Sequence, residues 1–256
     1  MIVVTTSQRA DARVKARAAA LAEQFGAAFI ERNKQPVSKL AAFYECPVLL
    51  VSKERLELHD GSGAPFFFHP GSAMFRVKRL TGGGEDELVN VCGLAGGMSF
   101  LDCTMGPAAD SITASAAVGE AGRVQAVEAN PLIAHIVREG LASWTDGPAP
   151  LLEAMRKIQV QAADYHTYLK GVPDASFDVV YFDPMFETAV DSSGIAPLRS
   201  FASYTDLTIE AVREAKRIAR RRVVLKDHFR SERFAKLGFT QQIRKTSKFH
   251  FGTIER

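Results

Sequence analysis

The chain has 256 residues, of which 46% are hydrophobic and 24% are charged. This balance argues against global disorder, and the length suits one medium domain with a small appendage. The formal net charge of +3 permits nucleic-acid binding but does not by itself indicate it. The three cysteines form no CxxC pair and the histidines have no ligand spacing, so we expect reduced thiols and no metal site.

The sequence contains no basic-then-apolar leader and no apolar run long enough to cross a bilayer. We therefore expect a cytoplasmic protein that does not bind membranes. The sequence does not indicate the oligomeric state.

The first 70 residues have the hydrophobic periodicity of a small α/β domain. Strands are expected over 2–5, 27–31, 47–53 and 55–59, and helices over 14–25 and 36–44. His69-Pro70-Gly71 breaks the pattern, and a second domain is expected over 71–256. A helix is expected over 88–94, and Gly82-Gly83-Gly84 before it is interpreted either as a lid or as a linker.

Beyond Met98 the pattern alternates between strands and helices. Strands are expected over 100–103, 124–128, 158–162, 177–182 and 223–226, and helices over 111–118, 131–141 and 207–219. Two extended runs, 240–244 and 248–254, are expected to pair antiparallel. This alternation predicts an α/β fold with a mostly parallel, doubly wound sheet, which binds ligands at the carboxyl edge of its strands.

The first informative segment lies at the end of the strand over 100–103. Asp102 ends a buried run, Thr104 and Gly106 lie in the turn, and a helix begins near Asp110. Gly106 allows a ligand to approach the backbone, and the new helix offers unpaired N–H groups. The alternative is an ordinary strand-to-helix turn with Asp110 as its N-cap.

Two further acids follow strands in the same half of the chain. Glu128 ends an apolar strand about twenty residues after Gly106, where a carboxylate can accept hydrogen bonds from ribose hydroxyls. Asp164 follows the next strand and is placed to accept an adenine amino group. The alternatives are a solvated strand-end glutamate and a turn aspartate.

The strongest signal is the loop Asp183-Pro184-Met185-Phe186, which follows the apolar strand 177–182 directly. Pro184 fixes its own φ and keeps Asp183 extended. The Asp183 carboxylate and a carbonyl near Pro184 can hold the N–H groups of an exocyclic base amine and aim its lone pair at a methyl donor. Phe186 can stack on that base. The alternative is that Asp-Pro merely turns the chain and Phe186 packs in the core.

Basic residues crowd the last fifty residues, interleaved with Phe239, Phe249 and Phe251. Two interpretations remain open, namely an RNA backbone surface and a solvated helix face. The residues are Arg213, Lys216, Arg217, Arg220, Arg221, Arg222, Lys226, Arg230, Arg233, Lys236, Arg244, Lys245 and Lys248.

The chain resembles the bacterial small-subunit ribosomal RNA guanine-N2 methyltransferases of the J type, and more closely their Gram-positive relatives. Three runs carry the resemblance, which covers roughly residues 66–256: Leu101-Asp102-Cys103-Thr104-Met105-Gly106, Glu128-Ala129-Asn130-Pro131 and Val180-Tyr181-Phe182-Asp183-Pro184-Met185-Phe186. It implies a Rossmann-like class I methyltransferase fold, S-adenosylmethionine as donor and a 16S ribosomal RNA guanine as acceptor. Its cofactor contacts would fall on Ala109, Asp110, Glu128, Ala129, Ala163, Asp164 and Asp183. Alanine stands at positions 109 and 129 where the family typically has arginine, and Ala163-Asp164 replaces a serine pair.

The sequence thus predicts an RNA-directed N-methyltransferase without a metal. Its predicted cofactor residues also include Asp102, Thr104 and Gly106, and its predicted catalytic residues are Asp183, Pro184 and Phe186. Other hypotheses are a methyltransferase for a small-molecule or protein amine, and a non-catalytic module that binds S-adenosylmethionine or RNA. A nicotinamide oxidoreductase is disfavoured because only one glycine of the GxGxxG pattern is present.

Overall fold

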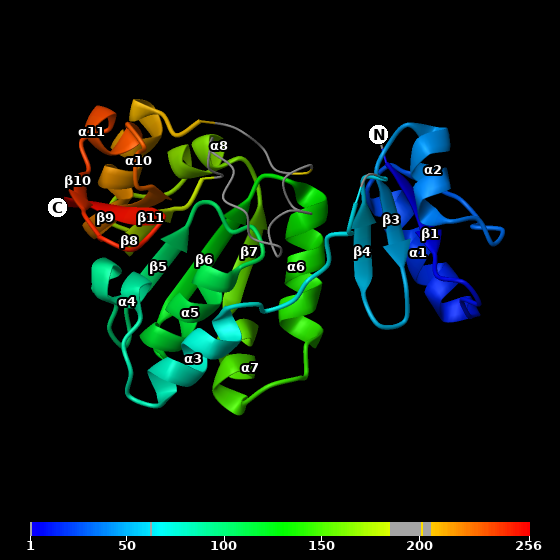
Figure 1. The fold of residues 1–256 in the computed structure, drawn as a ribbon, viewed down its shortest axis with the longest axis horizontal. Helices are drawn as coiled ribbons and strands as arrows, with labels where there is room; N and C mark the ends of the chain where they lie inside the picture. Colours follow the sequence, from blue (N-terminus) through cyan, green and yellow to red (C-terminus); the bar gives the residue numbers. More distant parts are fainter. Residues whose placement is uncertain (1, 62, 185–200, 202–205) are drawn as a thin grey trace. The chain divides into compact units, whose positions relative to one another are not determined.

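The computed structural model describes residues 2–61, 63–184, 201 and 206–256. Its contacts divide the chain into two compact units, with the division between His69 and Pro70 (Figure 1). Each unit is built around its own sheet. Whether residues 1–70 fold independently stays a prediction.

The first unit has a four-stranded sheet in the order β2-β1-β3-β4, in which only β4 is antiparallel to its neighbour. Every residue of β1 and β3 is buried, as expected for central strands made of apolar runs. Asp11 caps the first helix by accepting a hydrogen bond from the Val14 amide at 2.8 Å. The elements are β1 (Val3–Thr6), α1 (Ala12–Gln24), β2 (Ala28–Phe29), α2 (Val37–Tyr44), β3 (Val48–Val51) and β4 (Leu56–His59).

The second unit has a seven-stranded sheet in the order β10-β11-β9-β8-β5-β6-β7. The strands from β9 to β7 are parallel, and β11 is antiparallel to both of its neighbours. This confirms the predicted doubly wound sheet and its antiparallel closing pair. The strands are β5 (Ser99–Asp102), β6 (Arg123–Glu128), β7 (Ile158–Ala162), β8 (Phe177–Phe182), β9 (Ala219–His228), β10 (Thr240–Gln242) and β11 (Phe249–Glu255).

Helices cover both faces of this sheet. Helices α3, α5 and α7 contact one another and α5 packs on β5 and β6, whereas α10 packs on β8, β9 and α8. Right-handed crossovers in opposite directions along the sheet place these two groups on opposite faces. The helices are α3 (Ala73–Thr81), α4 (Glu87–Cys92), α5 (Ala109–Val118), α6 (Pro131–Ser143), α7 (Ala149–Arg156), α8 (Tyr165–Lys170), α10 (Ile209–Ile218) and α11 (Arg233–Lys236).

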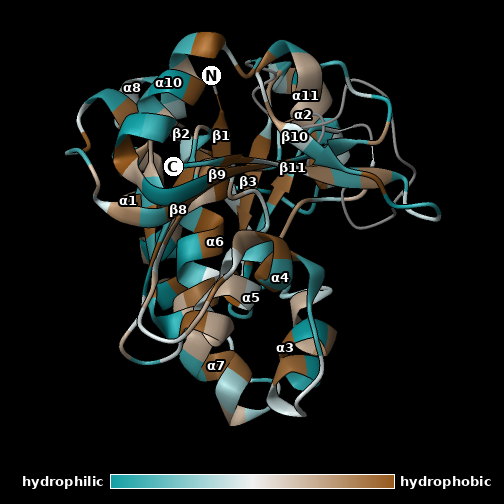
Figure 2. Cartoon of the chain, turned by 90° about the vertical axis from the view of Figure 1, so that its left-hand side faces the viewer, coloured by the Kyte–Doolittle hydropathy of each residue, from teal (hydrophilic) through white to brown (hydrophobic). Residues whose placement is uncertain are grey.

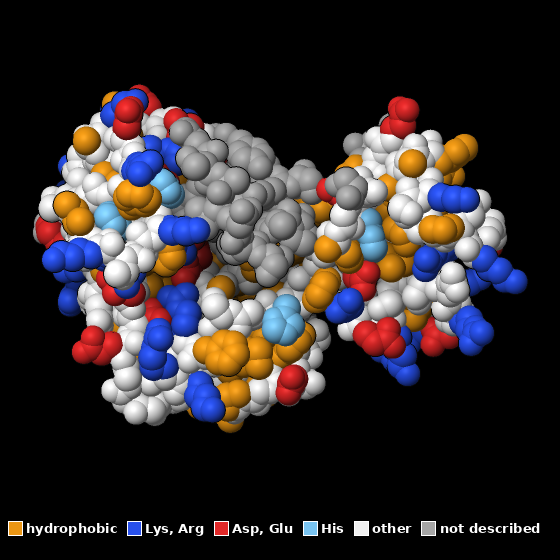
Figure 3. Space-filling view, in the orientation of Figure 1, with side chains coloured by type: hydrophobic (Ala, Val, Ile, Leu, Met, Phe, Trp, Pro, Cys, Tyr) orange, Lys and Arg blue, Asp and Glu red, His pale blue; other side chains and the backbone are white. Residues whose placement is uncertain are grey.

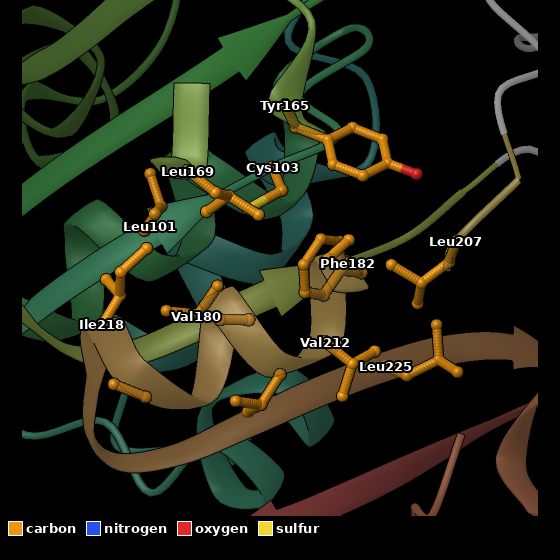
Figure 4. Packing of buried hydrophobic residues seen from close by; sticks show 14 of the residues in the cluster. Leu101, Cys103, Tyr165, Leu169, Val180, Phe182, Leu207, Val212, Ile218 and Leu225 are labelled. Carbon is orange, nitrogen blue, oxygen red and sulfur yellow. The ribbon is translucent and has the colours of Figure 1, made fainter. Parts of the chain in front are cut away.

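The face under α10 holds a large hydrophobic cluster. Ala211, Val212, Ala215 and Ile218 lie on one side of α10 and are buried, so the helix has hydrophilic residues on its other side (Figure 2). They pack with aliphatic and aromatic side chains of β5, β8 and β9, among them Leu101, Val180, Phe182 and Leu225 (Figure 4). This packing fixes the end of β8, and with it the backbone that leads into Asp183.

Most elements agree with the sequence prediction, and the exceptions among the described residues are four helices that it missed. The bounds of β7 and β8 are as predicted, but the prediction contained no α3, α7, α8 or α11. The Gly82-Gly83-Gly84 segment is a turn at the end of α3, where each glycine amide donates to a carbonyl of that helix. Within the described residues, no helix is long and apolar enough to cross a membrane.

Candidate functional site

The candidate site lies where the strand order of the large sheet reverses. From β5 the chain runs outward through β6 and β7, and then crosses to β8 on the other side of β5. Ligands of doubly wound sheets bind outside the carboxyl ends of the strands at such a point. Asp102 ends β5, Glu128 ends β6 and Asp183 follows β8, so the structure brings these three predicted residues to one edge.

The turn after β5 joins the other two strand ends through hydrogen bonds. The Thr104 hydroxyl accepts from the Asp183 amide at 2.6 Å, and the Gly106 amide donates to Glu128 Oε2 at 3.0 Å. Gly106 has a φ of +49°, a left-handed conformation that favours glycine. The turn and the two acids therefore form one hydrogen-bonded frame.

Asp102 lies beneath this turn. Its carboxylate is almost fully buried and accepts hydrogen bonds from the Thr104 amide at 3.0 Å and from the Ser111 hydroxyl at 2.5 Å. Burial raises the pKa of Asp102 to about 7, although both hydrogen bonds act in the opposite direction. Asp102 thus holds the turn from inside, and its predicted contact with a cofactor stays a prediction.

Glu128 lies at the carboxyl end of β6, as the sequence predicted, and its contact with a ribose stays a prediction. Its two oxygens accept hydrogen bonds from the amides of Gly106 and Asn130, at 3.0 and 2.9 Å. Burial raises its pKa against these two hydrogen bonds. A carboxylate offers about four lone-pair positions, so Glu128 can still accept bonds from the hydroxyls of a bound sugar.

Asp110, in the first turn of α5, is the centre of a charged network. Its carboxylate accepts from Arg76 at 2.5 Å, from the Tyr181 hydroxyl at 2.8 Å and from Lys226 Nζ at 3.1 Å. Burial acts to raise the pKa of Asp110, but the charges of Lys226 and Arg76 hold it well below its usual range. With three protein donors, Asp110 organises the site more than it offers free acceptors to a ligand.

Lys226 extends this network to Asp183. Its ammonium group lies 2.6 Å from Asp183 Oδ2 as well as near Asp110, and the side chains of all three residues are largely buried. Burial and the negative charge of Asp110 raise the pKa of Asp183 to about 6, while Lys226 acts to lower it. The Asp183 Oδ1 atom has no protein partner among the described residues. One oxygen is therefore anchored, and the other is available.

The remaining predicted residues flank this edge. Asp164 caps α8 by accepting from the Thr167 amide at 3.2 Å, and its contact with an adenine stays a prediction. The Ala163 amide donates to the Glu128 carbonyl at 3.0 Å, and Ala109 and Ala129 follow the β5 and β6 ends. Pro184 is buried. Met185 and Phe186 lie outside the described residues, so the stacking role of Phe186 stays a prediction.

The basic cluster predicted for the last fifty residues needs a correction. Lys226 belongs to the internal network, and Arg233 pairs with the buried Asp227 at 3.0 Å and with Asp206 at 2.7 Å. Phe239 and Phe251 lie in the core. On the face shown in Figure 3, basic and acidic side chains are interspersed over the α10–α11 end of this unit. The buried Asp227 carboxylate requires a partner of opposite charge, which Arg233 supplies.

Sequence reasoning missed Arg76, Tyr181 and Lys226 as members of the site. Only Lys226 carries a signal in the sequence, because it follows Val223-Val224-Leu225 and is therefore a cation at the end of a buried strand. Among the described residues, no group of His, Cys, Asp and Glu is arranged to hold a metal ion.

Comparisons with known proteins agree with this geometry. Residues 39–250 match the family described as "Putative SAM-dependent methyltransferase". The uncharacterized protein YpiP of Bacillus subtilis is 46% identical over 254 residues, which cover 99% of each chain. The ribosomal RNA small subunit methyltransferase J of Cellvibrio japonicus is 32% identical over 135 residues, 49% of this chain and 50% of that enzyme.

The fold is also that of a solved methyltransferase. The crystal structure of a SAM-dependent methyltransferase from Neisseria gonorrhoeae superposes with a TM-score of 0.66 at 18% identity, covering 100% of this chain and 96% of the other. At this identity the likeness concerns the fold alone, which is Rossmann-like, as in class I methyltransferases.

Proposed function

We propose that this chain, which belongs to the SAM-dependent methyltransferase family, methylates the exocyclic amine of a guanine in small-subunit ribosomal RNA. One observation carries the proposal. Asp183 presents an anchored carboxylate directly before Pro184, at the same sheet edge as the frame formed by Gly106 and Glu128.

The frame fits an adenosyl cofactor. Glu128 retains acceptor positions for ribose hydroxyls, and the left-handed Gly106 keeps a side chain away from the space beside them. When bound, S-adenosylmethionine supplies a methyl group that its sulfonium charge already activates. The negative charges of Glu128 and Asp183 at this edge favour a cationic ligand there.

The acceptor chemistry is assigned to Asp183 and the adjoining backbone. A guanine amine is a poor nucleophile because its lone pair is delocalised into the ring. Asp183 Oδ1 and a carbonyl near Pro184 would accept its two N–H groups, hold the nitrogen and direct the lone pair at the methyl group. Because Lys226 fixes the other oxygen of Asp183 at 2.6 Å, this acceptor is preorganised.

The ribosomal substrate is supported by the relatives rather than by a base-reading surface. Proteins named ribosomal RNA small subunit methyltransferase J match about half of this chain or more, and the loop Asp183-Pro184-Met185-Phe186 resembles theirs. A guanine within a helix would have to leave its stack to reach Asp183. Phe186 is proposed to stack on the extruded base.

A transfer assay tests this proposal. Purified protein and isotopically labelled S-adenosylmethionine are incubated with small ribosomal subunits from a strain lacking the gene, and the digested RNA is chromatographed. Labelled N2-methylguanosine is expected. Label in protein or small amines instead of RNA would contradict the acceptor assignment, and failure of the cofactor to bind in calorimetry would contradict the activity itself.

A further inference from the structure

The first unit has its own ligand edge, which the proposed methyl transfer does not use. Its chain runs from β1 to β2 on one side and then crosses to β3 on the other side of β1, so the strand order reverses at β1. Parallel sheets with the order 2-1-3 bind ligands at the carboxyl ends of the strands where the order reverses. The residues after Thr6 occupy that position.

A cavity of about 380 Å³ lies at this edge. Its volume falls within the range of roughly 300–1,000 Å³ that small-molecule sites span, and it is large enough for one nucleotide. The cavity is formed by the loop after β1, the loop after β2 and the first turn of α1. Its lining residues are Thr6, Ser7, Gln8, Arg9, Ala10, Lys15, Glu31, Arg32, Asn33 and Lys34.

The charge of this lining is strongly one-sided. It contains four cations and one carboxylate, a net charge of +3, and that carboxylate, Glu31, is paired with Lys15 at 3.1 Å. The nearby Asp11 is occupied in capping α1. Within the described residues no acid pairs with Arg9 or Lys34.

The backbone at this edge is also held in an unusual conformation. Arg9, Asn33 and Lys34 have φ angles of 62°, 46° and 62°, in the left-handed region that long side chains rarely adopt. Such a conformation costs roughly 1 kcal/mol or more per residue, and residues in it cluster at ligand sites. Two of the three are the cations that have no acidic partner.

We propose that this cavity, named here the β1–β2 cavity, binds a phosphate-bearing nucleotide of the RNA substrate. Arg9 and Lys34 would pair with the phosphate oxygens, and the hydroxyl and amide groups of Ser7, Gln8 and Asn33 would hydrogen-bond the attached nucleotide. The assignment rests on the proposed function for the identity of the chain that carries the phosphate. In this proposal the first unit binds a part of the RNA other than the reacting base.

Binding of a labelled single-stranded RNA oligonucleotide to the full chain tests this role without methyl transfer. R9Q/K34Q removes the two cations, while K39Q/K53Q removes two exposed cations of the same unit that do not line the cavity. Both variants lose the same charge, so a non-specific electrostatic attraction that depends only on net charge would decrease equally in both. We expect R9Q/K34Q to weaken binding about tenfold at low salt and to reduce the salt slope by about 1.4, with a much smaller loss in K39Q/K53Q.

Three outcomes would overturn the inference. Equal losses in both double variants would assign the effect to net charge, and no loss in R9Q/K34Q would remove the site. Guanosine monophosphate binding that disappears in R9Q/K34Q while RNA binding persists would identify a free nucleotide as the ligand. D183N separates the two proposals because it should lower the rate of methyl transfer about 10³-fold, while RNA affinity should fall much less than it does in R9Q/K34Q.

Discussion

At the carboxyl edge of the seven-stranded sheet, acidic and basic side chains pair with one another in a buried network. At the carboxyl edge of the four-stranded sheet, the cations Arg9 and Lys34 face solvent. Asp110, Lys226 and Asp183 lie within 3.1 Å of a partner and are largely buried. Arg9 and Lys34 are exposed. Internal pairing fixes geometry, which a reaction requires, while unpaired cations keep their charge for a ligand. Similar strand arrangements thus differ in their electrostatics, and we propose a different role for each edge.

Substitution of Asp183 is expected to have the largest effect and tests the catalytic side of this comparison. Replacing Asp183 by Asn keeps the shape but removes the negative charge that polarises the amine, so the rate of methyl transfer is expected to fall about 10³-fold. S-adenosylmethionine should still bind in calorimetry. D174N is the matched control, because Asp174 is an exposed acid paired with Arg217. Equal activity in D183N and D174N would remove the catalytic assignment.

The second test removes the shared cation. Lys226→Met leaves the buried Asp183 carboxylate without a cation and leaves Asp110 with Arg76 as its one cation, so the free energy of unfolding is expected to fall by about 3 kcal/mol. Lys236→Met is the control, since Lys236 and Glu232 are exposed and their pair contributes about 0.5 kcal/mol or less. Similar losses measured by urea unfolding in both variants would show that the network does not stabilise the site.

The same lysine is expected to control the pH dependence of the reaction. The pKa of Asp183 is about 6, and only its charged form accepts both the lysine and the amine. The rate should therefore decrease as pH falls through about 6. Loss of Lys226 raises the pKa of Asp183, so this decrease should begin at a higher pH in K226M. An unchanged profile would argue against coupling.

Asp102 is expected to have a smaller effect, on stability rather than on rate. Its pH dependence has the opposite sign to that of Asp183, because stability is lost as pH rises. Its pKa is 3.8 when unfolded and about 7 when folded, so between these values the folded state binds more protons. Stability from this group is therefore complete below about pH 3.8 and is lost as pH rises towards 7. Asp102→Asn cannot titrate, so its stability should fall less than that of the native chain across this window. Parallel stability curves in urea unfolding would contradict the buried placement.

The smallest expected effect is at the exposed edge. Lys34 has a left-handed backbone conformation, which a glycine adopts without strain. Lys34→Gly should therefore raise the free energy of unfolding by about 0.5 kcal/mol. RNA affinity should fall at the same time, because a ligand contact is lost. If the variant's stability did not increase and its RNA affinity did not decrease, Lys34 would be an ordinary loop residue.

The sequence predicted the arrangement of strands well because strand ends are marked locally. An apolar run followed by an acid or Asp-Pro identified the ends of β5, β6 and β8, and parallel pairing then required Asp102, Glu128 and Asp183 to meet. Helix α3 is nine residues long and buries only Ala73 and Val77, so few of its apolar positions mark it as part of a packed core.

The network could not be predicted in the same way. Asp110 meets Arg76, Tyr181 and Lys226 across 34, 71 and 116 positions of sequence. Such pairings follow from how the chain crosses the sheet, which no local pattern contains. For the same reason, the burial that gave Asp102 an internal role was not visible in its position at a strand end.

Nucleoside analysis of small-subunit ribosomal RNA from a deletion strain and its parent tests the central claim most directly. Mass spectrometry is expected to find less N2-methylguanosine in the deletion strain, restored by the native gene and not by one encoding D183N. Identical N2-methylguanosine content in all four strains would contradict the claim that this chain methylates a ribosomal guanine.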